Sequence, residues 1–381
     1  MVLKFQRLTV GTVGARKTHA VLATGVILAF YAAGAHAAIL LERVTLPVNI
    51  EHDSNPLMQY GNASSIWKLT FTPQYSVRRV DEQTQWTADF GLQIDRTSNQ
   101  DLVINREDPR LGLGWRRTFE RGEAGIRLGY DEASSRTSTL EETGTTGSDT
   151  TRASKTLGVD GRYEMSEKLS LGMNGSYTRM TFRGQGSGAG SRNYAASASL
   201  NYQYSDYLAP YLQLSTSRSD PDDTTATNLI SAVAGVRWML SPTLSAGGYI
   251  GKNRRSGGFS GQGKEYGANL SYVLERSAYT LMYSQSVSPA GNGGFIESEQ
   301  LSGGWKYDIS DYSRAGADFS LRKNTGSGDG ETDRLSLWYG RDLTRDWNLK
   351  ASYQYKITKG TTDQATGNVF GITVGYNFSE F

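Results

Sequence analysis

Long segments of this chain alternate strictly between apolar and polar residues, and this alternation constrains the fold more than any other feature of the sequence. In residues 85–95 the apolar members are Trp86, Ala88, Phe90, Leu92 and Ile94, and each is followed by a polar residue or glycine. Residues 347–358 repeat the pattern. Successive side chains of a β-strand point to opposite faces, whereas a helix needs a period near 3.6 residues. The chain is therefore predicted to consist of strands with one apolar and one polar face.

The length of these segments separates a membrane barrel from a soluble sandwich. They run for about 10 to 14 residues, whereas strands of soluble sheets average about five or six and tilted membrane strands need about 9 to 11. Tyr and Trp often lie at the ends of the apolar rows, as in the aromatic girdles of outer-membrane barrels. The opposite rows carry small polar and charged residues, which suit contact with water.

Short and long connections alternate along the chain. Longer segments rich in Gly, Ser, Thr and Asp, of which residues 137–151 are the longest, separate tight turns predicted near Asp81, Gly122, Ser166, Asp206, Ser241, Ser277, Ser310 and Thr344. Short periplasmic turns and longer outer loops are typical of bacterial barrels. Counting back from a last strand at 369–378 to a first strand at 44–52 gives about 18 strands, with 16 as the alternative. The predicted fold class is all-β: a transmembrane antiparallel up-and-down β-barrel of a Gram-negative outer membrane.

Composition excludes several other classes. The 381 residues include no cysteine, which rules out disulfide scaffolds and Cys-based zinc sites. Only 37% of the residues are hydrophobic, which argues against a bundle of membrane helices. The 8 prolines are few because central strands must donate every ladder hydrogen bond.

The N-terminal segment has the features of a secretory signal. Basic residues precede an apolar run at 21–33, and Ala35-His36-Ala37 supplies the small residues that a signal peptidase reads. We expect residues 1–37 to be cleaved and residues 38–381 to form the barrel. The mature chain would then carry 36 basic and 38 acidic residues, so no nucleic-acid partner is indicated.

The residues needed for an enzyme are scarce. His52 is the only histidine beyond residue 37, and it lies between Glu51 and Asp53. Neighbouring residues of a strand point to opposite faces, so neither carboxylate is placed to orient the ring. Metal-ligand spacings, phosphate loops and nucleophile elbows are missing from the sequence. We therefore expect no enzymatic activity, catalytic residue, cofactor or metal site, and we assign His52 to the outer membrane interface.

A barrel of about 18 strands leaves an aqueous lumen, so conduction is the natural function. Arg116 and Arg127 are nearly symmetric about the turn at 121–122, which predicts cross-strand neighbours, with Arg110 higher on the same wall. Like charges directly opposite each other are destabilising. Two interpretations remain open. The first is an arginine ladder that guides an anionic solute. The second is a packed polar wall in which inward carboxylates such as Asp89, Asp131 and Asp160 neutralise the arginines.

A second basic group is predicted near the outer mouth. Arg322, Arg334 and Lys356 fall on three consecutive strands, and Lys350 lies lower on the same wall. By the parity of the alternation, Tyr249 and Trp338 also point inward, where aromatic rings could stack on sugars. These residues complete the predicted solute path.

The final strand carries a candidate assembly signal. Its apolar row ends with Tyr376 and Phe378, and the chain ends on Phe381, although Ser379 and Glu380 shift this last residue out of register. A terminal aromatic residue after an amphipathic strand resembles the signal that delivers outer-membrane proteins to their assembly machinery. The alternative is an edge strand that happens to end in Phe.

At residues 49–57, around Asp53-Ser54-Asn55-Pro56, the chain resembles outer-membrane β-barrels encoded with exopolysaccharide machinery, including PEP-CTERM/exosortase-associated and Vibrio-polysaccharide types. The resemblance implies an exit channel for an exopolysaccharide, which a periplasmic polysaccharide-export protein would deliver. Outer-membrane lipids would surround the barrel. Inward rows of Ser, Thr, Asn and Gln would give a sliding polymer many weak hydrogen bonds.

Two other functions remain open. The inward rows would equally suit a general or anion-selective diffusion porin. Porins usually fold one long loop inside, and the modest length of residues 137–151 mildly disfavours this function but leaves that segment as a candidate constriction. A structural or adhesive barrel without transport is disfavoured because long adhesive loops are missing from the sequence.

Overall fold

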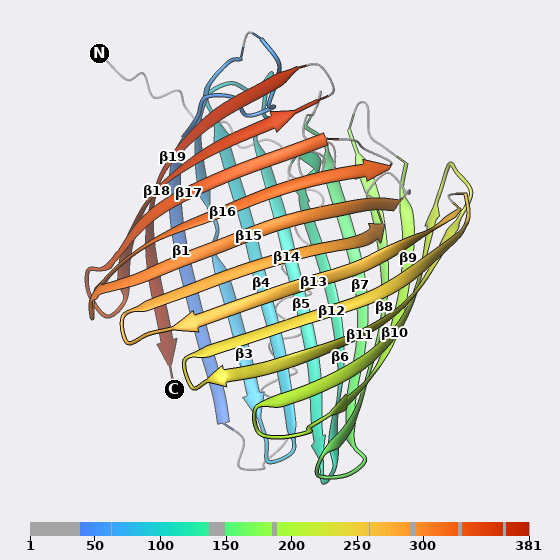
Figure 1. Ribbon diagram of the computed structural model, residues 1–381. Coiled ribbons are helices and arrows are strands. Elements are labelled where there is room, and N and C mark those ends of the chain that lie inside the picture. Colours follow the sequence, from blue (N-terminus) through green and yellow to red (C-terminus); the bar gives the residue numbers. More distant parts are fainter. Residues whose placement is uncertain are drawn as a thin grey trace, which may run out of the picture.

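The computed structural model describes residues 39–61, 63–136, 149–184, 189–258, 260–289, 295–326, 330–360 and 363–380. The predicted signal at 1–37, the terminal Phe381 and most of the segment 137–151 lie outside the described residues. Nearly all of the described chain is β-strand (Figure 1). No helix in this part of the chain is long and apolar enough to cross a membrane.

The strands follow one another along the chain as successive hairpins. In order they are β1 (Ile39–Asp53), β2 (Ile66–Phe71), β3 (Gln74–Val80), β4 (Thr84–Thr97), β5 (Arg106–Phe119), β6 (Gly122–Ser134), β7 (Thr151–Glu164), β8 (Leu169–Arg183), β9 (Ser191–Tyr202), β10 (Leu208–Pro221), β11 (Thr227–Ser241), β12 (Leu244–Gly257), β13 (Gly261–Val273), β14 (Ser277–Pro289), β15 (Phe295–Ser310), β16 (Ser313–Gly326), β17 (Gly330–Asp342), β18 (Trp347–Lys359) and β19 (Gln364–Glu380).

β2 and β3 are two halves of one barrel strand. Both pair with β1 on one side and with β4 on the other. The break falls at Thr72 and Pro73, where proline has no N–H to donate to the ladder. Thr72 still donates its N–H to the Pro47 oxygen at 3.0 Å, so the ladder continues past the interruption. The nineteen elements therefore make an 18-strand barrel.

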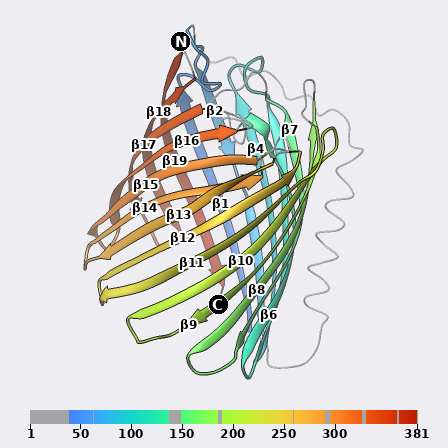
Figure 2. The ribbon, with the colours of Figure 1, turned by 45° about the vertical axis from the view of Figure 1, so that its right-hand side comes forward.

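The barrel closes between its first and last strands. β1 pairs antiparallel with β19, from Glu42 opposite Glu380 to Asp53 opposite Val369. With β2 and β3 counted as one strand, every other pair of neighbours in the sheet is consecutive in sequence, and all the pairings are antiparallel. The strands run obliquely around the wall in both views (Figures 1 and 2). The predicted antiparallel up-and-down barrel of about 18 strands is confirmed, and the alternative of 16 strands is wrong.

Short turns and longer loops lie at opposite ends of the barrel, as the sequence predicts. All eight predicted tight turns connect consecutive strands; in the β15–β16 turn, for example, only two residues separate Ser310 from Ser313. The turn after β3 is closed by a hydrogen bond from the Asp81 N–H to the Thr84 oxygen, at 2.8 Å. On bacterial barrels the end with short turns faces the periplasm.

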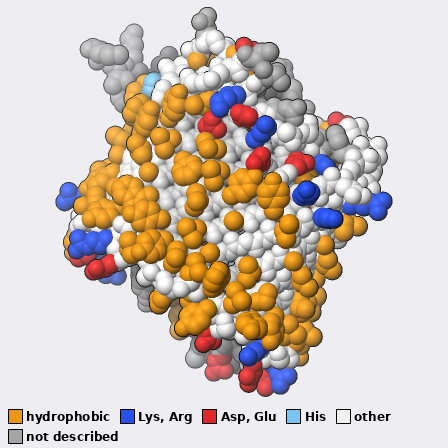
Figure 3. Space-filling model, viewed as in Figure 1, with side chains coloured by type: hydrophobic (Ala, Val, Ile, Leu, Met, Phe, Trp, Pro, Cys, Tyr) orange, Lys and Arg blue, Asp and Glu red, His pale blue; other side chains and the backbone are white. Residues whose placement is uncertain are grey.

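The apolar rows cover the outside of the barrel. Leu212, Leu214 and Ile250 keep 58%, 64% and 69% of their surface exposed, which lipid would cover. The space-filling view shows hydrophobic side chains as a broad belt across one face, with charged side chains gathered beyond its edges (Figure 3). Near the turn end, the rings of Trp347 and Tyr376 lie 5.1 Å apart, as expected for an aromatic girdle.

Candidate functional site: the lumen and the outer mouth

Alternation along each strand decides which side chains face the lumen. In β10 the exposed Leu212 and Leu214 face outward, so Tyr211 and Gln213 face inward, and the register carries this assignment to neighbouring strands. The same parity places every residue of the predicted solute path on the inner side: Arg110, Arg116, Arg127, Arg322, Arg334, Lys350, Lys356, Tyr249 and Trp338.

The register corrects one prediction about the first arginine group. Arg116 lies opposite Gly125, and Arg127 lies opposite Gly114, so the two arginines are diagonal rather than direct neighbours. The turn is centred between residues 120 and 121, because Phe119 pairs with Gly122. The prediction placed the centre one residue later, which shifts the expected cross-strand pairing by two residues.

A carboxylate lies between these two arginines. The Asp160 Oδ1 is 2.6 Å from an Arg127 nitrogen, and its Oδ2 is 3.3 Å from an Arg116 nitrogen. Arg116 also pairs with Glu123 at 2.9 Å. These distances favour the neutralised polar wall over an unpaired arginine ladder. Arg110 stands apart, opposite Asp131 and Gly91, and donates to the Gln93 side-chain oxygen at 3.4 Å.

The second basic group includes a direct pair of cations. Arg334 lies directly opposite Lys356, and Arg322 is one diagonal step away because it faces Thr332. The Lys356 ammonium lies 2.9 Å from the Asp53 carboxylate, and only 12% and 6% of their side-chain surfaces are exposed. Arg322 donates to the Gln300 side-chain oxygen at 2.9 Å. These contacts hold Arg322 and Lys356 against the wall.

Aromatic side chains line two further parts of the wall. The Lys350 ammonium lies 5.4 Å from the centre of the Trp338 ring, and the Trp338 Nε1 donates to Asp318 at 3.0 Å. Tyr249 lies against Gly267, where an added Cβ would come within 2.5 Å of the ring. The absence of a side chain on Gly267 therefore lets this ring lie flat against the neighbouring strand.

A related pair of side chains beside Tyr249 was not predicted from the sequence. Tyr211 lies against Gly235 in the same way, and the Arg237 guanidinium is 5.0 Å from the centre of its ring. Gly235 is the register partner of both Tyr211 and Tyr249, so the two tyrosines flank it. This inward cluster was predictable from the alternation in β10, because the outward Leu212 and Leu214 place Tyr211 on the inner face.

The motif at 53–56 has a structural role in this barrel. The Asn55 N–H donates to the Asp53 Oδ1 at 3.0 Å, and the Asn55 side-chain amide donates to the Thr366 oxygen at 3.1 Å. The Ser54 N–H donates to the Asn368 oxygen at 2.9 Å, and the Asn368 N–H donates to the Ser54 hydroxyl at 2.8 Å. The motif thus ties β1 to β19 at the outer end of the closing seam.

A buried ion-pair cluster reinforces the outer mouth. Arg106 pairs with Asp108 at 2.6 Å and with Asp149 at 3.2 Å, and all three side chains are almost fully buried. From the same loop region, Arg136 donates to the Pro56 oxygen at 2.9 Å. One end of the β6–β7 loop is therefore fastened to the segment that follows β1, through Arg136, and the other end is fastened to β5, through Asp149. Loop packing of this kind leaves no periodic signal in the sequence, so these residues could not be predicted from it.

Residues near the outer end of the β14–β15 hairpin pack against β11. Leu229, Val287 and Phe295 form a buried apolar cluster, and Arg255 lies 3.8 Å from Glu297 beside it. Leu229 is next to the outward-facing Ile230, so the cluster forms on the inner side of β11. The candidate constriction at 137–151 lies mostly outside the described residues. Val287 and Phe295 of β14 and β15 lie against the inner side of β11.

Comparisons with known proteins support the fold. No protein-family model matches the sequence, and no curated protein matches it either. Among solved structures, Acinetobacter baumannii OccAB4 is 11% identical, with 90% of this chain and 98% of that chain covered and a TM-score of 0.51. The outer-membrane protein OpdK of Pseudomonas aeruginosa is 10% identical, with 90% and 99% covered and a TM-score of 0.53. OpdO from the same organism is 12% identical, with 90% and 98% covered and a TM-score of 0.51.

These matches overturn the expectation of exopolysaccharide export. The matched structures are outer-membrane porins of the Occ and Opd groups, and not polysaccharide exit channels. The short motif on which the resemblance rested is accounted for by its hydrogen bonds across the seam. At these identities the likeness establishes the fold. The chain is therefore a closed 18-strand β-barrel of the Gram-negative outer membrane.

Proposed function

We propose that this barrel is a diffusion porin for small polar solutes, in which charged and aromatic side chains line the path. The observation that carries the proposal is the inward row of paired charges within an 18-strand barrel, a size that leaves an aqueous channel. The predicted path residues act as its lining, and Tyr211 and Arg237 join them. Residues 1–37 are proposed to direct secretion, and Tyr376, Phe378 and Phe381 to direct assembly.

The proposed lining carries both signs of charge side by side. Asp160 offsets Arg116 and Arg127 on one sector of the wall, while Asp318 lies beside Trp338 and Lys350 on another. Charges of one sign along a low-dielectric wall concentrate the opposite ion, whereas adjacent opposite charges largely cancel at a distance. We therefore propose weak selectivity between small anions and cations.

Planar-bilayer recordings of the purified barrel test this proposal. In a potassium chloride gradient we expect stepwise conductance with a reversal potential near zero. The substitution Asp160→Asn removes the carboxylate that Arg116 and Arg127 share, while Arg116 keeps Glu123. The lining gains one net positive charge, so the reversal potential should shift toward that of chloride. Asp333→Asn is the matched control, because Asp333 lies opposite Leu321 and Ile357 on the outward face and should leave selectivity unchanged.

Two results would contradict the proposal. A folded barrel that gives no conductance steps would instead be a structural barrel without transport. If Asp160→Asn leaves the ion selectivity unchanged, the ions do not pass near Arg116 and Arg127.

A further inference from the structure

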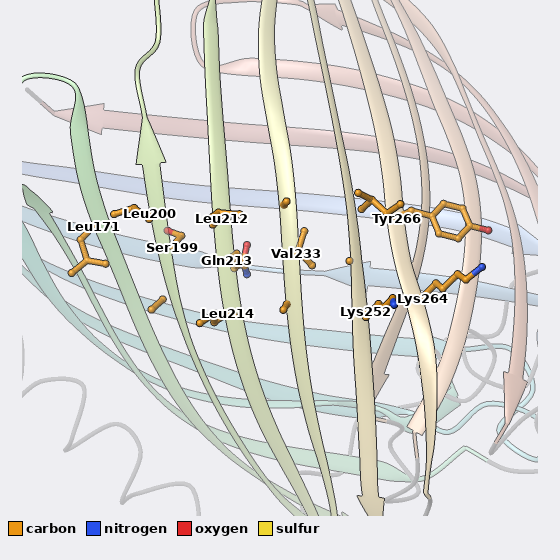
Figure 4. A pocket seen from close by; sticks show the side chains of 15 residues that line it. Leu171, Ser199, Leu200, Leu212, Gln213, Leu214, Val233, Lys252, Lys264 and Tyr266 are labelled. Carbon is orange, nitrogen blue, oxygen red and sulfur yellow. The ribbon is translucent and has the colours of Figure 1, made fainter.

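The outer wall carries a hollow within its lipid-facing belt. Its volume is about 870 Å³, and it extends from β8 to β13 (Figure 4). One row of outward side chains crosses it on six neighbouring strands, in the order Leu171, Leu200, Leu212, Ala234, Ile250 and Tyr266. The Ala234 side chain is much shorter than those of Leu212 and Ile250 on either side, so it leaves a depression between them. Ala198 and Ala232 are likewise short side chains in the adjacent outward row. The hollow is thus apolar and open to lipid.

Two lysines stand at the loop end of this hollow. Lys252 and Lys264 are direct register partners, and they share the outward parity of Ile250 and Tyr266. Both are exposed, and Arg254 follows two residues later on the same face. Like charges directly opposite each other destabilise a sheet, and charge on the lipid-facing side of a barrel is tolerated only near the interface. This placement therefore needs a compensating anion.

The described part of the chain supplies no such anion. Within it, no carboxylate forms an ion pair with Lys252, Lys264 or Arg254. Arg179, an outward-facing cation on β8, differs from these three residues. Its guanidinium donates two hydrogen bonds, of 2.7 and 2.8 Å, to the Asp222 carboxylate. Those hydrogen bonds lower the pKa of the Asp222 carboxyl, which keeps it ionised. Arg179 is thus neutralised by the protein, whereas the three cations at the hollow are not.

We propose that this lysine-capped hollow, formed by the two outward rows and by Lys252 and Lys264, binds an outer-leaflet lipid that carries phosphate on its headgroup. The acyl chains lie over Ala232 and Ala234, and the phosphate lies between the two ammonium groups. The apolar hollow and the unpaired cations match the two halves of such a lipid. The inference concerns the outer wall and does not depend on transport through the lumen.

Native mass spectrometry of the purified barrel, titrated with hexa-acyl lipid A bisphosphate, tests the proposal. In Lys252→Gln/Lys264→Gln the affinity should fall at least tenfold. The matched control is Lys323→Gln/Lys359→Gln, which removes two outer-rim lysines already paired with Glu331, at 3.7 and 3.6 Å, and it should bind normally. Heat-modifiable mobility on gels verifies that every variant is folded.

Two further measurements separate a lipid from free phosphate. Filling the hollow with Ala232→Phe or Ala234→Leu, which leaves both lysines intact, should weaken lipid A binding, while millimolar inorganic phosphate should not displace it. Unchanged affinity in the lysine double variant would overturn the proposal. Full displacement by inorganic phosphate, or undiminished binding after the hollow is filled, would also overturn it.

Discussion

Removal of the Lys356 ammonium should open the outer end of the closing seam. Lys356 and Asp53 are 2.9 Å apart and nearly buried, and Asp53 also accepts the Asn55 N–H. In Lys356→Met the Asp53 carboxylate stays buried without its counter-charge, which typically costs about 3 to 5 kcal/mol. At about 1.4 kcal/mol per factor of ten, this corresponds to roughly 140- to 3700-fold more frequent local opening. Even half of this cost gives more than a tenfold effect.

Amide hydrogen exchange of the folded barrel measures this opening. The informative amides are those of Ser54 and Asn368, whose hydrogen bonds hold β1 against β19, and that of Gln59, which donates to the Asn55 side-chain oxygen within the segment 54–59. In Lys356→Met these amides should exchange faster, while amides in the middle of β19 should keep their protection. The seam, rather than the whole barrel, should respond because the remaining ladder between β1 and β19 is intact.

Two variants complete the test. Asp53→Asn/Lys356→Met removes both charges, leaves an oxygen for the Asn55 N–H, and should recover much of the lost protection. Lys350→Met is the control, because this lysine lies in the same strand over the Trp338 ring, six residues from Lys356 and away from the outer end of the seam. Unchanged exchange in Lys356→Met, or equal loss in both single variants, would refute the reasoning.

Two further predictions concern packing and processing. Gly122→Ala should destabilise the folded barrel by about 1 to 3 kcal/mol in a denaturant titration, because a Cβ there would lie 2.1 Å from the Arg162 backbone oxygen. Gly129→Ala is the control and should be almost neutral in this titration, because the nearest atom to its Cβ would be 3.7 Å away. N-terminal sequencing of the protein from purified outer membranes should begin at Ala38, and an intact N-terminus would refute the predicted signal.

The architecture could be read from the sequence because a barrel strand repeats one physical rule along its length. Lipid on one side and water on the other force a period of two, so the strand near Trp86 and the turn near Ser310 are predictable from local residues. The same rule gives the side of the wall on which Trp338 lies.

The alternation of apolar and polar residues does not determine the exact strand register or the packing of the loops. The pairing of Arg116 depends on whether the turn is centred before or after residue 121, and a shift of one residue in that centre moves the pairing by two. The buried cluster around Arg106 joins residues more than forty positions apart through loops, and nothing periodic marks it. The functional expectation failed for a related reason: a four-residue motif that fastens a seam was interpreted as the sign of an export family.

The central claim is that the lumen passes small polar solutes. Liposome swelling with the reconstituted barrel, over a series from arabinose to long dextrans, tests it most directly. We expect fast swelling with mono- and disaccharides and progressively slower swelling as the solute grows. Swelling no faster than that of empty liposomes, for every solute in the series, would contradict the account.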